Sequence, residues 1–158
     1  MVRRMIDVLV DEGISFEPPK NIKAAILAAC DSAGFKAQTP SLCVRFASDQ
    51  AVRNLNQQWR KQDKVTDVLS FPMQEAPFDL SMPLGDMALA VPFIVQEAAR
   101  LQLPAADHCL HLIIHATLHL LGFDHIDDDD ANRMQALEQM AMRRMGLFDP
   151  YPAMETTA

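Results

Sequence analysis

The segment HLIIHATLHLLGFDH, residues 111–125, decides how this chain is interpreted. Its histidines at positions 111, 115 and 119 are four residues apart, so on a helix they lie on one face, one turn above another. Leu, Ile, Ala and Thr occupy the other faces, and the pattern therefore predicts a buried helix over residues 104–121 with one imidazole stripe. Gly122 is suited to a left-handed helix cap, after which the chain turns back towards the same face at His125.

The spacing of these histidines indicates a metal site. The row from His111 to His119 spans about 12 Å at about 1.5 Å per residue, whereas a zinc–nitrogen bond measures only about 2.1 Å. Two ligands therefore come from the helix, His115 and His119, and the third, His125, comes from beyond it. Three imidazoles favour one Zn²⁺ ion per chain with an open coordination position. The alternative is a set of polar core or surface histidines without a metal.

Strand and helix patterns alternate through the rest of the chain. Apolar alternation and β-branched runs predict strands over residues 5–10, 41–47, 65–71 and 85–91, with an exposed loop over 73–83. Helical spacing predicts helices over residues 20–33, 48–60, 92–101 and 127–145, with Ser48 as the N-cap of the second. The predicted class is α+β (mixed α/β), with a sheet of about four strands packed with about five helices. One compact domain over residues 1–150 and a loose tail over 151–158 complete this prediction.

The composition excludes several classes of protein. Hydrophobic residues make up 49% of the chain and charged residues 22%, which fits a folded globular protein and argues against intrinsic disorder. The three cysteines, Cys30, Cys43 and Cys109, form neither a CxxC pair nor a secreted disulfide framework, so reduced thiols in a cytoplasmic protein are expected. The N-terminal segment lacks a signal-peptide pattern, and the apolar run over residues 109–123 is too short for a membrane span. We therefore expect a cytoplasmic location and no membrane.

The distribution of charge is more informative than its sum. A net charge of −7 counts against a general nucleic-acid binder, since such proteins carry a basic footprint. Five of the 14 basic residues nevertheless fall within residues 45–64, and they leave room for a local basic patch. They are Arg45, Arg53, Arg60, Lys61 and Lys64.

The histidine spacing also fits HExxHxxGxxH, the pattern of the metzincin peptidases. In that pattern a Glu follows the first histidine and acts as general base, whereas Ala116 occupies this position here. Peptide hydrolysis by the same mechanism would lack its proton acceptor. A zinc metallopeptidase-like hydrolase is therefore an alternative interpretation.

HATLHLLGFDH, residues 115–125, resembles the HGxLHLxGYDH signature of the YbeY family of bacterial rRNA-maturation endoribonucleases. Ala116 replaces Gly and Phe123 replaces Tyr, and the histidines are kept. Further upstream, LNQQWR (55–60), VTDVLSFP (65–72) and LGD (84–86) are similar to family segments in the same order. The resemblance covers approximately residues 46–151.

This resemblance implies a zinc-dependent, single-strand-specific endoribonuclease that acts in rRNA maturation and ribosome quality control. Zinc would be held by the three histidines, and Arg60 would be the functional arginine, whose planar guanidinium can contact phosphate at two points. The implied partners are rRNA precursor and a ribosomal subunit or ribosome-associated proteins. Arg45, Arg53, Lys61 and Lys64 are candidates for extending the RNA contact. A non-catalytic, zinc-stabilised ribosome-assembly factor is a further alternative.

Two carboxylates are candidates to orient the zinc ligands. Metal-binding histidines commonly donate their second ring N–H to a carboxylate. Asp124 immediately precedes a ligand, and Asp86 lies near the start of a predicted strand. Either one can accept such a hydrogen bond.

Overall fold

A computed structural model describes residues 6–124 and 126–152 of the chain. Over these residues, four strands and five helices alternate as the sequence predicts, which confirms the α+β class. In chain order the elements are β1 (Ile6–Val10), α1 (Ile22–Ser32), β2 (Ser41–Ala47), α2 (Asp49–Arg60), β3 (Val68–Pro72), β4 (Pro83–Ala90), α3 (Val91–Leu101), α4 (Ala105–Leu120) and α5 (Asp128–Arg144).

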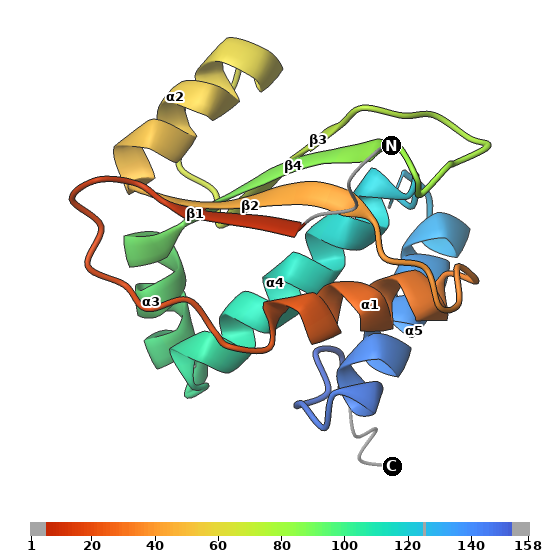
Figure 1. Cartoon of the computed structure of the whole chain (residues 1–158). Coiled ribbons are helices and arrows are strands. Elements are labelled where there is room, and N and C mark those ends of the chain that lie inside the picture. Colours follow the sequence, from red (N-terminus) through yellow and green to blue (C-terminus); the bar gives the residue numbers. More distant parts are fainter. Residues whose placement is uncertain (1–5, 125, 153–158) are drawn as a thin grey trace.

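The strands form one mixed sheet in the order β1-β2-β4-β3. β1 runs parallel to β2 and β2 parallel to β4, whereas β3 pairs antiparallel with β4 and forms an edge. In Figure 1, α4 and α1 lie under one face of the sheet, and α2 stands over the other. β2 shows the reason: Leu42, Val44 and Phe46 are buried towards the helices, while Cys43 and Arg45 between them remain partly exposed.

The predicted histidine helix is α4, at the centre of the fold. Leu110, Ile113 and Leu118 are at most 2% exposed, whereas the three histidines at 111, 115 and 119 are partly exposed. The predicted imidazole stripe on an otherwise buried helix is thus confirmed. The helix ends at Leu120, and Gly122 follows at φ +89°, the left-handed cap that the sequence predicts.

Local hydrogen bonds set the other element boundaries. Ser48 caps α2 as predicted, since its Oγ accepts a hydrogen bond from the Ala51 N–H at 3.1 Å. Asp127 caps α5 through the Asp130 N–H at 2.8 Å. β3 begins at Val68, three residues later than predicted, because Asp67 Oδ1 accepts the Val68 N–H at 2.7 Å and makes a turn there.

Gly85 allows the sheet to approach the end of α4 closely. Its φ is +150°, and a Cβ atom at this position would lie 2.4 Å from the Phe71 carbonyl oxygen and 2.8 Å from Leu120 Cδ2. Only a residue without a side chain fits between β3 and the last turn of α4. This contact sets β3 beside the helix that carries the histidines.

Two further predictions concern the thiols and the membrane. All three cysteines are free, and Cys30 and Cys109 are buried. Within residues 6–124 and 126–152, no helix is long and apolar enough to cross a membrane.

The sequence predicts a loose tail from residue 151 onward. Tyr151 is instead held by hydrogen bonds to Glu138 and Gln139 of α5, and residues 153–158 lie outside the described part of the chain.

Candidate metal-binding and catalytic cleft

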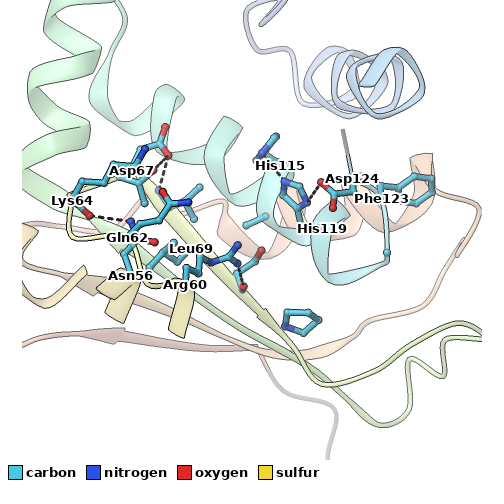
Figure 2. Close-up of a pocket in the computed structure, with 16 residues that line it drawn as sticks. Asn56, Arg60, Gln62, Lys64, Asp67, Leu69, His115, His119, Phe123 and Asp124 are labelled. Carbon is cyan, nitrogen blue, oxygen red and sulfur yellow. Dashed lines mark hydrogen bonds and ion pairs between the residues drawn. The ribbon is translucent and has the colours of Figure 1, made fainter. Parts of the chain in front are cut away.

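A cleft of about 640 Å³ lies between the end of α2, the edge strand β3 and the last turns of α4. Figure 2 shows His115 and His119 on one side of it and Arg60 on the other. These three residues, which the sequence predicts to act together, therefore face one space. The cleft is also lined by Asn56, Lys64, Asp67, Ser70, Pro72, Ala116 and Asp124.

His115 and His119 present a pair of converging nitrogen atoms. Their Nε2 atoms are 3.0 Å apart, and their rings are nearly perpendicular at 82°. Two ligands on one zinc ion can be at most about 4.2 Å apart when each bond is about 2.1 Å. The separation of the two nitrogens and their chemistry therefore fit two ligands of one ion.

The third predicted ligand cannot be placed. His125 lies outside the described residues. Within those residues, no group of three or more His, Cys, Asp or Glu side chains is arranged to hold a metal ion. The complete three-histidine site therefore stays a prediction, and of its residues the structure describes the two histidines on α4.

Glu138 on α5 orients His115. This carboxylate is 1% exposed, and its Oε1 atom lies 2.9 Å from His115 Nδ1 and 3.0 Å from His111 Nε2. Tyr151 donates its hydroxyl to Glu138 Oε2 at 2.9 Å. Burial alone would raise the pKa of Glu138, but the hydrogen bonds from His111 and His115 outweigh burial and lower it to about 2.

The ionised Glu138 fixes the tautomer of His115. A carboxylate only accepts hydrogen bonds, so the Nδ1 atom of His115 carries the proton and the Nε2 lone pair is directed into the cleft. The same carboxylate also contacts Nε2 of His111. His108, earlier on α4, contacts Glu97 of α3 at 2.6 Å instead.

The two carboxylates proposed from the sequence lie in different places. Asp124 lines the cleft, and its Oδ1 atom is 4.0 Å from His119 Nδ1, which is an ion-pair distance and long for a hydrogen bond. Asp86 lies on β4 in a second pocket and contacts neither of the two described ligands. Glu138, which neither spacing nor motif indicated, occupies the position expected for such a partner of His115.

Arg60, the last residue of α2, forms the opposite wall. Its Nη2 atom donates a hydrogen bond to the Ser70 carbonyl on β3 at 2.8 Å (Figure 2). A guanidinium has five N–H donors, so most of them stay available to a ligand in the cleft. The arrangement places a fixed positive group across from the histidine pair.

The remaining basic residues of the predicted patch separate in the structure. Lys64 lines the cleft with Arg60. Arg45 is held by Asp11 through three hydrogen bonds of 2.7–3.1 Å, and Arg53 by Asp63 at 2.7 Å. Lys61 follows the last residue of α2 as its C-cap, where it adopts the left-handed backbone conformation and is exposed.

Sequence reasoning missed two acidic residues of this region. Glu138 lies on the same face of α5 as the buried Met134 and Met142, and a charge on an apolar helix face is the signal that could have identified it. Asp67 lines the cleft, and burial raises the pKa of its carboxyl. Asp67 lies within the family-like segment VTDVLSFP (65–72), and that resemblance is the signal that could have identified it.

Comparisons with known proteins found chains that are similar over most of their length. The family model described as "Endoribonuclease YbeY" matches residues 11–146. Curated proteins of that name are similar to the chain. The one from Azorhizobium caulinodans is 40% identical, over 92% of this chain and 95% of its own length, and the one from Sinorhizobium fredii is 42% identical, over 83% and 77%.

A solved structure is similar in fold. The solution structure of TM1509 from Thermotoga maritima aligns with a TM-score of 0.57, over 94% of this chain and 100% of its own, at 22% identity. At that identity the likeness supports the architecture alone.

Proposed function

The chain belongs to the YbeY family of endoribonucleases, and from this premise we propose how its cleft hydrolyses RNA. One Zn²⁺ ion is held by His115, His119 and His125, and Arg60 binds the phosphate of the scissile bond. The observation that carries the proposal is the pair of Nε2 atoms 3.0 Å apart, which face the cleft that Arg60 also lines. When bound, a zinc ion with three protein ligands supplies Lewis acidity to the phosphodiester.

The chain's own residues bind and orient the RNA. Arg60 is anchored to the Ser70 carbonyl by one donor, so its remaining N–H groups can take a phosphate in two-point contact. There the guanidinium stabilises the negative charge that develops on the phosphate in the transition state. Lys64 lines the same cleft as Arg60 and adds a second positive charge for the phosphates of the RNA backbone.

The substrate in the cell is a further part of the proposal. We propose that the chain acts on single-stranded segments of rRNA precursors in the cytoplasm, in contact with a ribosomal subunit or ribosome-associated proteins. The family name supports RNA as the substrate, and the resemblance in the sequence motifs supports rRNA.

The other candidate functions have less support. A zinc peptidase would need a general base after the first histidine, and the residue there, Ala116, is 1% exposed and carries no proton acceptor. An assembly factor without activity would not need an anchored arginine facing the histidine pair.

Metal analysis and RNA cleavage test the proposal together. His115→Ala and His119→Ala should lose bound zinc and cleavage of a single-stranded RNA. Arg60→Ala should keep zinc and the fold, while its kcat for cleavage falls about 10²–10³-fold, as expected for removal of a donor to transition-state charge. Arg53→Ala, which removes a guanidinium from the same helix outside the cleft, is the matched control and should cleave at the wild-type rate.

Three results would contradict parts of the proposal. Wild-type zinc content in both histidine variants would remove the metal site. Full cleavage by Arg60→Ala would remove the role of the arginine and favour the assembly-factor alternative. Equal cleavage of the RNA alone and of its duplex would refute single-strand specificity.

A further inference from the structure

A second pocket of about 710 Å³ lies on the sheet face opposite α4. α2 covers one part of that face, where Val52 and Leu55 pack on Leu69 and Ala88. Beyond this contact no other helix of the described residues covers the face in Figure 1, and the pocket occupies that area. Its lining residues are Cys43, Arg45, Leu55, Trp59, Arg60, Ser70, Phe71, Pro72, Asp86, Met87 and Ala88.

This pocket adjoins the cleft. Arg60, Ser70 and Pro72 line both spaces, so the arginine and the edge strand β3 form the wall between them. An RNA strand whose phosphate is bound by Arg60 therefore has this pocket within reach of a neighbouring nucleotide.

We propose that the second pocket binds an unpaired base of the same RNA strand, stacked on Trp59. The inference rests on the proposed RNA cleavage in the adjoining cleft. Trp59 is 64% exposed, and it lines the pocket together with the apolar residues Leu55 and Phe71. Single-stranded RNA is recognised by this chemistry, in which bases stack on exposed aromatic rings next to a positive group that holds the backbone.

The charges of the pocket favour a base over a phosphate. Besides Arg60, the only basic side chain among its described lining residues is Arg45, whose guanidinium is bound by Asp11. Asp86 lines the pocket from β4, and its carboxylate would repel a phosphate. The same carboxylate can accept a hydrogen bond from the amino group of a base.

Such a pocket would also select single strands. A base inside a duplex is paired and stacked, and moving it into the pocket would cost a few kcal/mol of pairing and stacking. An unpaired base enters without that cost. The pocket thus gives a physical reason for discrimination that the catalytic cleft alone does not provide.

Trp59 is the single tryptophan of the chain, so its fluorescence reports on the pocket directly. We expect a short 2′-O-methyl oligoadenylate to quench this fluorescence on binding to the full-length, metal-loaded protein. The same backbone with abasic positions should bind more weakly and leave the fluorescence unquenched. Absence of quenching at saturating oligoadenylate would overturn the proposal.

Kinetics on cleavable RNA provide the second test. Trp59→Ala should raise KM about 5- to 100-fold with little change in kcat, because a stacked base contributes to binding, and Trp59→Phe should restore most of the affinity. Met140→Ala removes another exposed apolar side chain, 51% exposed on α5, and should behave as wild type. An unchanged KM in Trp59→Ala would leave the pocket to another occupant, such as a protein partner.

The two proposals can fail separately. If the wild type binds and quenches but does not cleave, the base site stands and the catalytic proposal is refuted. If the wild type cleaves without quenching, the catalytic proposal stands and the base site is refuted.

Discussion

Replacing Glu138 tests whether the hydrogen-bonded carboxylate behind His115 supports metal binding. Glu138→Ala leaves three buried or half-buried donors without their acceptor: His111 Nε2, His115 Nδ1 and the Tyr151 hydroxyl. Each buried donor without a partner costs about 1–3 kcal/mol. We therefore expect the metal-free variant to lose about 3 kcal/mol of unfolding free energy or more.

The effect on the metal is separate from this loss of stability. Without Glu138, the Nδ1 atom of His115 loses the carboxylate that fixes its proton, and loss of such a partner typically weakens metal binding about 10- to 100-fold. Glu138→Gln keeps the size of the side chain and one carbonyl acceptor for the histidines, but removes the negative charge. We expect it to fold nearly as well as the wild type and to bind zinc with an affinity between those of the wild type and Glu138→Ala.

Zinc affinity is measured by competition with a chromogenic chelator, and stability by chemical unfolding of the metal-free protein. Gln139→Ala is the matched control, because Gln139 is the next residue of α5 and donates to Asp149 and to the Tyr151 carbonyl without contacting a histidine. It should bind zinc as the wild type does. Wild-type zinc affinity in Glu138→Ala, at protein concentrations where it is folded, would refute the reasoning.

Three further predictions concern packing, thiols and pH. Gly85→Ala should cost about 3 kcal/mol of unfolding free energy, because its Cβ would meet backbone and side-chain atoms of its neighbours. Gly13→Ala is the control: Gly13 has φ +86° and open space around it, so this change should cost only about 1–2 kcal/mol. Equal losses in the two variants would contradict the role of these contacts. Burial raises the pKa of all three thiols, and it raises those of the buried Cys30 and Cys109 to about 12. At pH 8 in the native protein, a thiol reagent should therefore modify the partly exposed Cys43 much faster than the other two, and equally rapid labelling of all three would argue against it. Asp11→Asn should lower stability at neutral pH by at most about 1 kcal/mol. The hydrogen bond to Arg45 lowers the pKa of Asp11 below its usual value of 3.8. The difference in stability between wild type and variant is therefore present above pH 3.8 and should vanish as the pH falls through the lowered pKa. A difference that persists in acid would rule out the ion pair as its cause.

The sequence predicted the local part of the site. His115 and His119 are one helical turn apart, and a helix fixes their relation without help from the rest of the fold. The same is true of Ser48, whose hydroxyl contacts a residue three positions away. Such short-range geometry follows from spacing, and for that reason these predictions agree with the structure.

The supporting part of the site depends on long-range packing. The partner of His115 comes from α5, 23 residues further along the chain, and the second pocket exists because β4 lies between β2 and β3 in the sheet. Neither relation has a fixed spacing in the sequence. The sequence therefore suggested Asp124, which precedes His125, and Asp86, near the start of a predicted strand, as partners of the predicted ligands, whereas α5 supplies the close carboxylate at His115.

Gly85 shows how one residue links the two walls of the cleft. Arg60 is anchored to the carbonyl of Ser70 on β3, and His119 lies in the last turn of α4. The distance between phosphate-binding and metal-binding groups is therefore set by how closely β3 approaches α4, and Gly85 lies at that approach, against Leu120. A side chain at Gly85 has to push the strand and the helix apart, which also moves Arg60 away from the histidines. Because positioning errors of about 1 Å can cost about 10²-fold in rate, Gly85→Ala should reduce cleavage even under conditions where the variant is fully folded.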